Sequence, residues 1–321
     1  MKIDITSLLL VLLILCMIYY NRREGYDNVY EYREFWTENV PESTKMYFNM
    51  LLDPIDIKKR VYIHSVFDNL PYEDKDKDKS KSEVHILING ETWDKGNLED
   101  YDVKLIMEET DIKNGVICHP LFIMDSYVYN YWPRYMSVRR PIKKKKFCIF
   151  VVSNSNSYDV KVRNKFFEKL NNYKKVDSGG GALNNMGMNV PRNDESKGDY
   201  SYYEFLSDYK FMICFENKSK SNYLTEKLAN AYLGGTVPIY WGASKVREWL
   251  NPKSFLQLEE TGTEEEMDRL INKIKEIDND DILYDEMYRQ PLMYSIHEEL
   301  DINKVREKVH EIVVCSNNTR L

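Results

Sequence analysis

A carboxylate and an ammonium group stand next to each other where a helix is expected to begin. Glu226 and Lys227 follow Thr225, a residue type that favours the position just before a first helical turn. The free N–H groups of a first turn favour phosphate, and an adjacent lysine strengthens that preference. A neighbouring carboxylate can accept hydrogen bonds from the hydroxyls of a ribose or another sugar. The pair therefore indicates a site for a nucleotide or a phosphorylated sugar.

Four more polar side chains are candidates for the same chemistry. Arg163 is suited to bind a diphosphate and to stabilise it as it leaves. Asn217 can donate to a phosphate oxygen, and Tyr223 can stack on a base or a sugar. Glu91 can act as a general base that takes a proton from an acceptor hydroxyl. Taken singly, Arg163 is more often a surface ion-pair partner, and Glu91, like Glu226 and Lys227, is more often a solvated residue. The residues alone therefore indicate only a two-domain α/β enzyme that handles a nucleotide or a phosphate.

The elements that must position these side chains form one βαβ unit over residues 209–242. Residues 211–215 are a short apolar run, typical of a strand buried on both faces. The helix expected from Thr225 stops at two consecutive glycines, and residues 236–240 resume an apolar run. Ligands of open α/β sheets bind beyond the carboxyl ends of the strands. The loop before the helix is therefore where a site is expected.

Apolar runs elsewhere predict two Rossmann-like halves that face each other across a cleft. The further strands are expected at residues 60–67, 84–88, 103–107, 115–118, 147–153 and 176–178. A helix over residues 160–173 would carry Arg163 in its first turns, and amphipathic helices are expected over 264–277 and 302–314. The predicted division is a membrane anchor over residues 1–23, a stem over 24–44, a first domain over 45–142 and a second domain over 143–321.

An apolar stretch opens the chain. Residues 5–20 are almost wholly apolar and no small-residue cleavage site follows them, so an uncleaved signal anchor and a single-pass membrane protein are expected. Positive charge lies before the stretch at Lys2 and after it at two arginines, which leaves the orientation open and leans slightly towards a cytosolic domain. Glycosylation sequons begin at Asn217, where a glycan would obstruct the candidate site, and at Asn317.

Composition and missing motifs exclude several function classes. Hydrophobic residues make up 43% of the 321 residues, enough for a packed core, and the net charge of −7 gives no basic field that would attract nucleic acid. The five cysteines show neither disulfide nor metal-site spacing. No GxGxxG motif opens a helix after a strand, and GxxxxGK[ST] and GxSxG motifs are absent, which argues against dehydrogenases, P-loop NTPases and α/β-hydrolases. The Asp-X-Asp sequences at 100–102 and 278–280 are poorly placed to hold a metal-bound nucleotide sugar, so no metal site is predicted.

The order of residues between 209 and 242 resembles the signature of the α1,3/α1,4-fucosyltransferases of glycosyltransferase family 10. The matching pieces are Phe-Glu-Asn at 215–217, Tyr-Leu-Thr-Glu-Lys-Leu at 223–228 and Gly-Thr-Val-Pro-Ile-Tyr-Trp-Gly at 235–242. Shorter similarities lie at 151–154, 163–167, 176–180, 184–185 and 206–211. Asn-Gly-Glu at 89–91 is similar to the first-domain loop that carries the family's catalytic base. The similarity is strong over residues 147–260 and fair over 84–146.

This resemblance implies a GT-B fold and the inverting transfer of L-fucose from GDP-β-L-fucose to a hydroxyl of an acceptor glycan or glycoconjugate. The acceptor hydroxyl is expected to be O3 of an N-acetylglucosamine or glucose residue. The resemblance implies Glu91 as the general base, with Arg163 and Lys227 binding the pyrophosphate and assisting the departure of GDP. The donor site would be completed by Glu226 at the ribose or the fucose, by Asn217 and by Tyr223. No cofactor or metal ion would be required, and the family resemblance implies a Golgi-type lumenal orientation.

Two alternatives stay open at this point. One is a GT-B glycosyltransferase with another nucleotide-sugar donor, and the other is a catalytically inactive glycan-binding membrane protein. The chain departs from the family in an unusually basic loop at residues 218–221, and the paired C-terminal cysteines of animal members are not evident. The first domain matches least, so the acceptor and the linkage position do not carry over.

Overall fold

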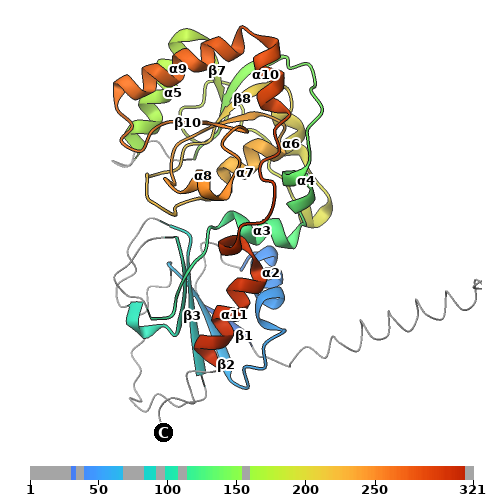
Figure 1. Ribbon diagram of the computed structural model, residues 1–321, viewed down its shortest axis with the longest axis vertical. Helices are drawn as coiled ribbons and strands as arrows, with labels where there is room; N and C mark the ends of the chain where they lie inside the picture. Colours follow the sequence, from blue (N-terminus) through green and yellow to red (C-terminus); the bar gives the residue numbers. More distant parts are fainter. Residues whose placement is uncertain are drawn as a thin grey trace, which may run out of the picture.

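Two five-stranded parallel sheets form the framework of the protein, one above the other in Figure 1. The structure is a computed structural model, and it describes residues 30–33, 40–67, 83–91, 98–107, 114–153 and 160–314. The predicted α/β class and the two Rossmann-like halves are confirmed by the parallel pairing in both sheets.

The first domain is a parallel sheet in the order β1-β2-β3-β4-β5. Its strands are β1 (Tyr30–Arg33), β2 (Arg60–Ser65), β3 (Glu83–Asn89), β4 (Val103–Ile106) and β5 (Val116–Cys118). Alternate residues of β3, namely Val84, Ile86 and Ile88, belong to the apolar core of this domain, together with residues of helix α2 (Glu42–Leu52). A short 3-10 helix, η1 (Leu98–Asp100), precedes β4.

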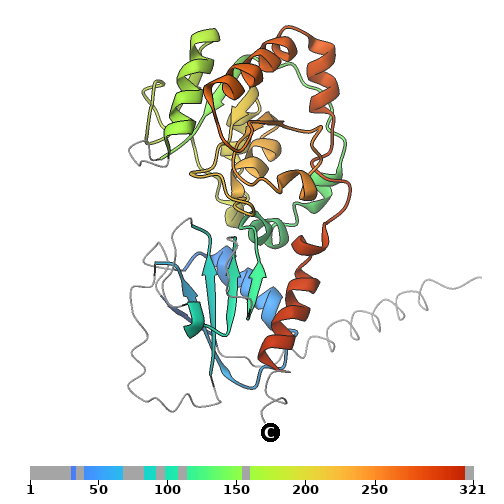
Figure 2. The same ribbon diagram turned by 60° about the vertical axis from the view of Figure 1, so that its left-hand side comes forward.

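Helices from opposite ends of the sequence cover the same face of this sheet (Figure 2). The last helix, α11 (Ile302–Val313), buries the apolar residues Ile302, Val305, Val309 and Val313 in the first-domain core. Arg306 donates from Nε to the Leu51 carbonyl at 3.2 Å, which ties α11 to α2. α11 therefore belongs to the first domain, although the predicted boundary placed residues 143–321 in the second. Periodicity revealed its apolar face but not the sheet that this face covers.

The stem predicted over residues 24–44 is partly built into the first domain. β1 pairs in parallel with β2, with Tyr30 opposite Val61 and Arg33 opposite His64. α2 begins at Glu42. The sequence of β1 alternates aromatic and charged residues over only four positions, which does not distinguish an edge strand from a polar linker. The first domain therefore begins before residue 45.

The second domain is a parallel sheet in the order β10-β9-β8-β6-β7. Its strands are β6 (Lys146–Phe150), β7 (Val176–Ser178), β8 (Tyr209–Ile213), β9 (Val237–Tyr240) and β10 (Leu256–Gln257). β7 lies on one side of β6, whereas β8, β9 and β10 lie on its other side. Such a switch point opens a crevice beyond the carboxyl ends of the strands, where ligands bind.

Helices cover both faces of this second sheet, as expected of strands that are apolar throughout. The helices α5 (Lys161–Tyr173), α9 (Glu264–Asp278) and α10 (Asp281–Tyr288) pack on one face around Phe166, Leu170 and Ile274. The other face is covered by α3 (Phe122–Val128), α4 (Trp132–Met136), α6 (Ser201–Leu206), α7 (Glu226–Leu233) and α8 (Val246–Trp249). The helices predicted over 160–173 and 264–277 are confirmed as α5 and α9.

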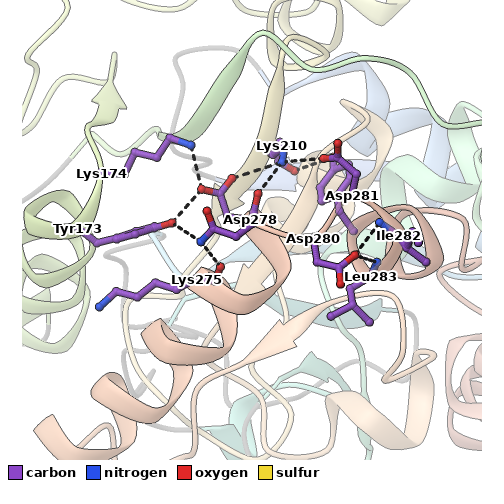
Figure 3. A network of polar contacts seen from close by, with 11 residues as sticks. Tyr173, Lys174, Lys210, Lys275, Asp278, Asp280, Asp281, Ile282 and Leu283 are labelled. Atoms are coloured by element: carbon purple, nitrogen blue, oxygen red, sulfur yellow. Dashed lines mark hydrogen bonds and ion pairs between the residues drawn. The ribbon is translucent and has the colours of Figure 1, made fainter.

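A network of polar side chains ties the helices of the second domain together near the amino ends of β7 and β8 (Figure 3). Asp278, buried at the end of α9, accepts from the Tyr173 hydroxyl at 3.0 Å and pairs with Lys174 at 2.8 Å. Lys210 donates to the backbone carbonyl of Asp278 at 2.9 Å. Asp280 caps α10 by accepting from two backbone N–H groups. Both aspartates of the 278–280 sequence thus have structural partners.

The predicted membrane anchor, residues 1–23, lies outside the described residues, as does the sequon at Asn317. Within the ranges that the structure describes, no helix combines the length and the apolar character needed to cross a bilayer. Cys148 in β6 and Cys214 directly after β8 are buried free thiols.

Candidate active site

A fully buried glutamate lies at the centre of the candidate site. Glu216 follows β8, and its carboxylate accepts from the backbone N–H of Thr225 at 2.8 Å and from the Thr225 hydroxyl at 2.7 Å. Lys227 donates to the same carboxylate at 2.9 Å. Burial raises the pKa of Glu216, and the Lys227 charge opposes that rise. These three bonds compensate for the loss of water around the carboxylate.

This contact determines how α7 begins. Thr225 occupies the position before the first turn, as predicted, but its hydroxyl bonds to Glu216 and does not cap the helix. The predicted end of the helix is confirmed, because α7 stops at Leu233 and Gly235 has a φ of 72°, a conformation that favours glycine. α7 is thus fixed at its amino end by the buried side chain of Glu216, from the segment that follows β8.

Lys227 remains a cation with capacity for a ligand. Burial acts to lower the pKa of Lys227, but the Glu216 and Glu226 carboxylates outweigh that effect and leave the pKa raised. An ammonium group has three N–H donors. Two of them bond to Glu216 and to the Thr225 hydroxyl, at 2.9 and 3.0 Å, among the described residues. The side chain is 23% exposed, so a third donor can reach an anion from solvent.

Arg163 is held by Asn217. The guanidinium Nη1 donates to Asn217 Oδ1 at 2.9 Å, and Arg163 is buried in the first turn of α5. Burial lowers the pKa of Arg163 to about 10, with the Glu216 charge acting in the opposite direction, so the group is still a cation at neutral pH. Asn217 was expected to donate to a phosphate oxygen. In the structure its oxygen positions Arg163, and its amide N–H groups take no part in that bond.

The expectation for Tyr223 does not agree with its position. The residue is 1% exposed and its ring belongs to the packed interior, so it has no open face to stack on a base or a sugar. Its backbone carbonyl accepts from the Tyr240 hydroxyl at 3.3 Å. Burial raises the pKa of Tyr223, and the charges of Glu216 and Glu91 add to that rise. Tyr223 therefore packs behind the charged groups.

The basic loop at residues 218–221 is anchored to the segment that follows β9. The Ser219 hydroxyl donates to the Gly242 carbonyl at 2.8 Å. Gly242 lies so close to the site that a methyl group on its Cα would overlap the side chains of Glu216 and Tyr240. The glycine is therefore required for Glu216 to reach Thr225.

A cavity of about 710 Å³ opens beside these charged groups. Glu226 lines it from the first turn of α7, and the glycine turn at residues 179–181 lines it from the end of β7. The lining is completed by Asp125, Val151, Ser153, Asn189, Val190, Pro191, Arg192, Asn193, Glu195, Tyr202, Tyr203 and Asn230. Of the six residues predicted from the sequence, Glu226 alone belongs to the lining that the described residues form. The cavity lies at the carboxyl ends of the second sheet, where the topology predicts a ligand site.

Glu91 faces this site from the first domain. It follows β3, and its backbone N–H donates to Asn89 Oδ1 at 2.9 Å. Burial raises the pKa of Glu91; the Lys227 charge opposes this rise, and the Glu226 and Glu216 charges add to it. These interactions require the four groups to lie within electrostatic range of one another. Gly90, the residue before Glu91, packs against the Leu121 side chain, and the Leu121 backbone N–H donates to the Leu224 carbonyl at 3.1 Å, so the loop after β3 lies beside the segment that leads into α7.

Sequence reasoning missed three acidic residues of this site. Glu216 lay inside the quoted Phe-Glu-Asn motif, and its position directly after a buried strand was the signal that could have found it. Asp125 on α3 and Glu195 line the cavity with Glu226. Desolvation by the cavity walls, together with the Glu195 and Glu226 charges, raises the pKa of Asp125 to about 6. No spacing in the sequence connects these residues, because they come from three separate elements.

Comparison with known proteins decides the family. Residues 141–320, more than half of the chain, match the family model described as "Glycosyltransferase family 10 (fucosyltransferase) C-term". The chain is a member of glycosyltransferase family 10. This family 10 chain is 38% identical over 150 residues to the alpha-(1,3)-fucosyltransferase FucT of Helicobacter pylori, a match that covers 46% of this chain and 28% of that protein. It is 30% identical over 148 residues to the human GDP-fucose protein O-fucosyltransferase 3, covering 46% and 30%.

The fold of this family 10 member agrees with solved structures. A crystal structure of an alpha1,3-fucosyltransferase with GDP-fucose aligns with a TM-score of 0.65 and 21% identity, over 92% of this chain and 91% of the other. A further crystal structure of an alpha1,3-fucosyltransferase aligns with a TM-score of 0.68 and 21% identity, over 93% of both chains. The chain spans about a third of the length of the two curated relatives named above. The alignments establish a GT-B-like α/β fold with two parallel sheets.

Proposed function

We propose that this protein transfers L-fucose from GDP-β-L-fucose to a hydroxyl of an acceptor glycan with inversion at the anomeric carbon. The observation that carries the proposal is the position of Glu91, in a loop of the first domain that packs beside the segment leading into α7, within electrostatic range of Lys227 and Glu226. A carboxylate on one side and cations on the other are the groups that such a transfer needs. Membership in family 10 supports GDP-fucose as the donor.

In the proposed reaction Glu91 takes the proton of the acceptor hydroxyl while the hydroxyl oxygen attacks the anomeric carbon of fucose. The bond between that carbon and the diphosphate oxygen breaks, and its electron pair leaves with GDP. Lys227 and Arg163 would neutralise the charge that develops on the diphosphate. The pKa of Lys227 is raised and the pKa of Arg163 is lowered only to about 10, so both groups are protonated at neutral pH. Glu226, on the cavity lining, would accept from a ribose or fucose hydroxyl.

The donor cavity suits this assignment. Its glycine turn allows close approach of the backbone to a ligand, and its volume of about 710 Å³ falls in the range of small-molecule and cofactor pockets. Asp125, Glu195 and Glu226 add hydrogen-bond acceptors for hydroxyl groups of ribose or fucose. We further propose that no metal ion is required, which activity in the presence of EDTA would test.

The acceptor class has a second candidate, because several relatives are named GDP-fucose protein O-fucosyltransferase 3. A serine or threonine hydroxyl of a polypeptide would fit the same base. The test is therefore transfer of labelled fucose to lactosamine-type, chitobiose-core and lipid-linked glycans and to serine- and threonine-containing peptides, with linkage analysis by NMR. An α-linked fucosyl glycan together with GDP release is the expected result.

Two outcomes of this assay would reject the proposal. A clear preference for a UDP-sugar over GDP-fucose would establish a glycosyltransferase with another donor. Binding of glycans without turnover of any donor would establish the inactive glycan-binding protein. If only the peptides are fucosylated, GDP-fucose stands as the donor and the glycan is rejected as the acceptor.

A further inference from the structure

A strongly basic segment leads from α4 to β6 in the second domain. Seven of residues 134–146 are lysine or arginine, and no aspartate or glutamate lies between Asp125 and Asp159, although the whole chain carries a net charge of −7. Arg134, Arg140 and Lys143 are exposed, and none of them forms an ion pair within the part of the chain that the structure describes. Their charge is therefore available to an external anion.

Exposed apolar side chains interrupt this basic segment. Met136, Val138 and Ile142 are 39%, 67% and 49% exposed. Tyr294 is 69% exposed. The two residues before it, Leu292 and Met293, donate their backbone N–H groups to the Tyr135 carbonyl at 2.7 and 3.3 Å. Figure 1 shows α4 beside this segment, which leaves α10. Four of the nine exposed large apolar side chains in the described ranges thus lie on residues 134–143 or on the segment bonded to Tyr135. We call residues 134–143 and Tyr294 the linker surface.

A pocket of about 410 Å³ borders the linker surface, which contributes four of its lining residues. Its lining is Pro133, Arg134, Ser137, Arg139, Arg140, Tyr232, Leu233, Gly235 and Tyr288. The Arg139 guanidinium lies 4.0 and 4.2 Å from the ring centroids of Tyr232 and Tyr288, which holds it in place. Burial and the adjacent Arg139 charge lower the pKa of Lys144 to about 8, as expected where positive charge accumulates.

We propose that the linker surface binds the headgroup layer of an anionic lipid bilayer, with a lipid phosphate at the arginine pocket and the exposed apolar side chains in the interfacial region. Basic residues are attracted to anionic headgroups, and aliphatic and aromatic side chains beside them insert at the boundary of the acyl chains. A soluble polyanion would engage the arginines but would give Val138 and Ile142 no apolar environment. The mixture of both residue types favours the bilayer.

The fold makes this contact compatible with the proposed transferase activity. The pocket is lined by Leu233 and Gly235 at the carboxyl end of α7, whereas the donor cavity is lined by Glu226 at its amino end and by Asn230. Arg134 of the pocket lies 5.7 Å from the ring centroid of Tyr203 on the cavity lining, so the two sites are neighbours. They share no lining residue, so a phosphate in the pocket would occupy none of the side chains that line the donor cavity. The inference does not depend on the donor or the acceptor.

Hydrogen exchange of the full chain tests the proposal. The protein is mixed with vesicles of phosphatidylcholine alone or of phosphatidylcholine with phosphatidylglycerol, and exchange is followed in peptides that cover residues 134–145 and 289–296. The readout is local because the apolar stretch at residues 5–20 can itself bind bilayers of either charge. We expect slower exchange in both peptides with the anionic vesicles and no change with the neutral ones.

Two charge-reversed variants provide a matched comparison. Arg140→Glu with Lys143→Glu removes basic contacts that each contribute about fivefold to binding, so at least about tenfold more anionic vesicle is needed for the same protection. Arg269→Glu with Lys308→Glu makes the same change in net charge at exposed helix positions outside the linker surface and should leave protection unchanged. Val138→Ser with Tyr294→Ser keeps the charge and should also weaken protection.

The following results would overturn the proposal. Equal protection by neutral and anionic vesicles would remove the role of the basic residues. An equal loss of protection in the two charge-reversed variants would show that the net charge of the protein, and not the linker surface, determines binding to anionic vesicles. Heparin in the absence of lipid could also slow exchange in these peptides. If it does so equally in the wild type and in the double variant Val138→Ser with Tyr294→Ser, the surface would be assigned to a soluble polyanion.

Discussion

The Glu216 carboxylate lies 2.9 Å from the Lys227 ammonium, and the glutamate side chain has no exposed surface. Removing one partner of a buried pair leaves an uncompensated charge. Glu216→Ala is therefore expected to lower the free energy of unfolding by about 3 kcal/mol, the lower end of the range for buried pairs because Lys227 is partly exposed. Urea unfolding followed by tryptophan fluorescence measures this change. The control is Glu264→Ala, which removes an exposed partner of Lys165 and should cost less than about 1 kcal/mol. Equal losses in the two variants would contradict the role of Glu216.

Replacement of the proposed base should separate chemistry from binding. Glu91→Gln keeps the size of the side chain but removes the group that accepts the proton, so kcat should fall by about 10²- to 10⁴-fold. The affinity for GDP, measured by calorimetry, should be unchanged because Lys227 and Arg163 are intact. Glu99→Gln, an exposed position on η1, is the matched control and should behave as the wild type. Normal turnover in Glu91→Gln would reject this residue as the base.

The pH dependence of kcat/KM should report the raised pKa of Glu91. Only the deprotonated carboxylate can accept a proton, so the rate should rise with pH through a pKa above the ordinary glutamate range. Glu226→Gln removes one of the negative charges that raise this pKa, although it also weakens donor contacts. The acid limb of its profile should therefore lie at lower pH than that of the wild type. An unshifted limb would show that Glu226 does not act on Glu91.

The buried histidine in the first domain should make stability depend on pH. His119 lies 2.6 Å from the Tyr47 hydroxyl, and burial lowers the pKa of His119 to about 4. Between pH 6.5 and 4 the unfolded chain binds a proton that the folded protein does not, so stability is lost as the pH falls. The loss reaches about 3 kcal/mol at pH 4. Denaturant unfolding of the wild type and of His119→Gln at a series of pH values measures this loss. In the variant, the free energy of unfolding should lack this part of its dependence on pH. Parallel slopes in both proteins would exclude His119 as its source.

Gly242 should tolerate no side chain. A methyl group there would overlap Glu216 and Tyr240, so Gly242→Ala is expected to displace Glu216 and to lower both stability and donor affinity. At Gly181, on the lining of the donor cavity, an added methyl group would lie 3.3 Å from the nearest atom, which a small shift accommodates. Gly181→Ala is therefore the comparison and should have the milder effect. Thermal unfolding with and without GDP measures both, and the reverse ranking would count against the packing described for Glu216.

The sequence by itself determined the elements of the second domain. β8 and α7 fall within two residues of their predicted limits, because apolar runs, a threonine before the helix and two glycines after it are local signals. The same signals placed Arg163 in the first turn of α5. Order and spacing of the motif residues also indicated the family, since these properties do not depend on knowing which elements pack together.

Only the tertiary structure decided the contacts between distant segments. Glu216 proved to hold Thr225 and Lys227, Asn217 proved to hold Arg163, and Tyr223 proved to be buried. The apolar face of α11 was visible in its periodicity, but its packing on the first domain depends on how the chain returns across both sheets. Local patterns specify which face of an element is buried, whereas the partner of that face is set by packing of the whole chain.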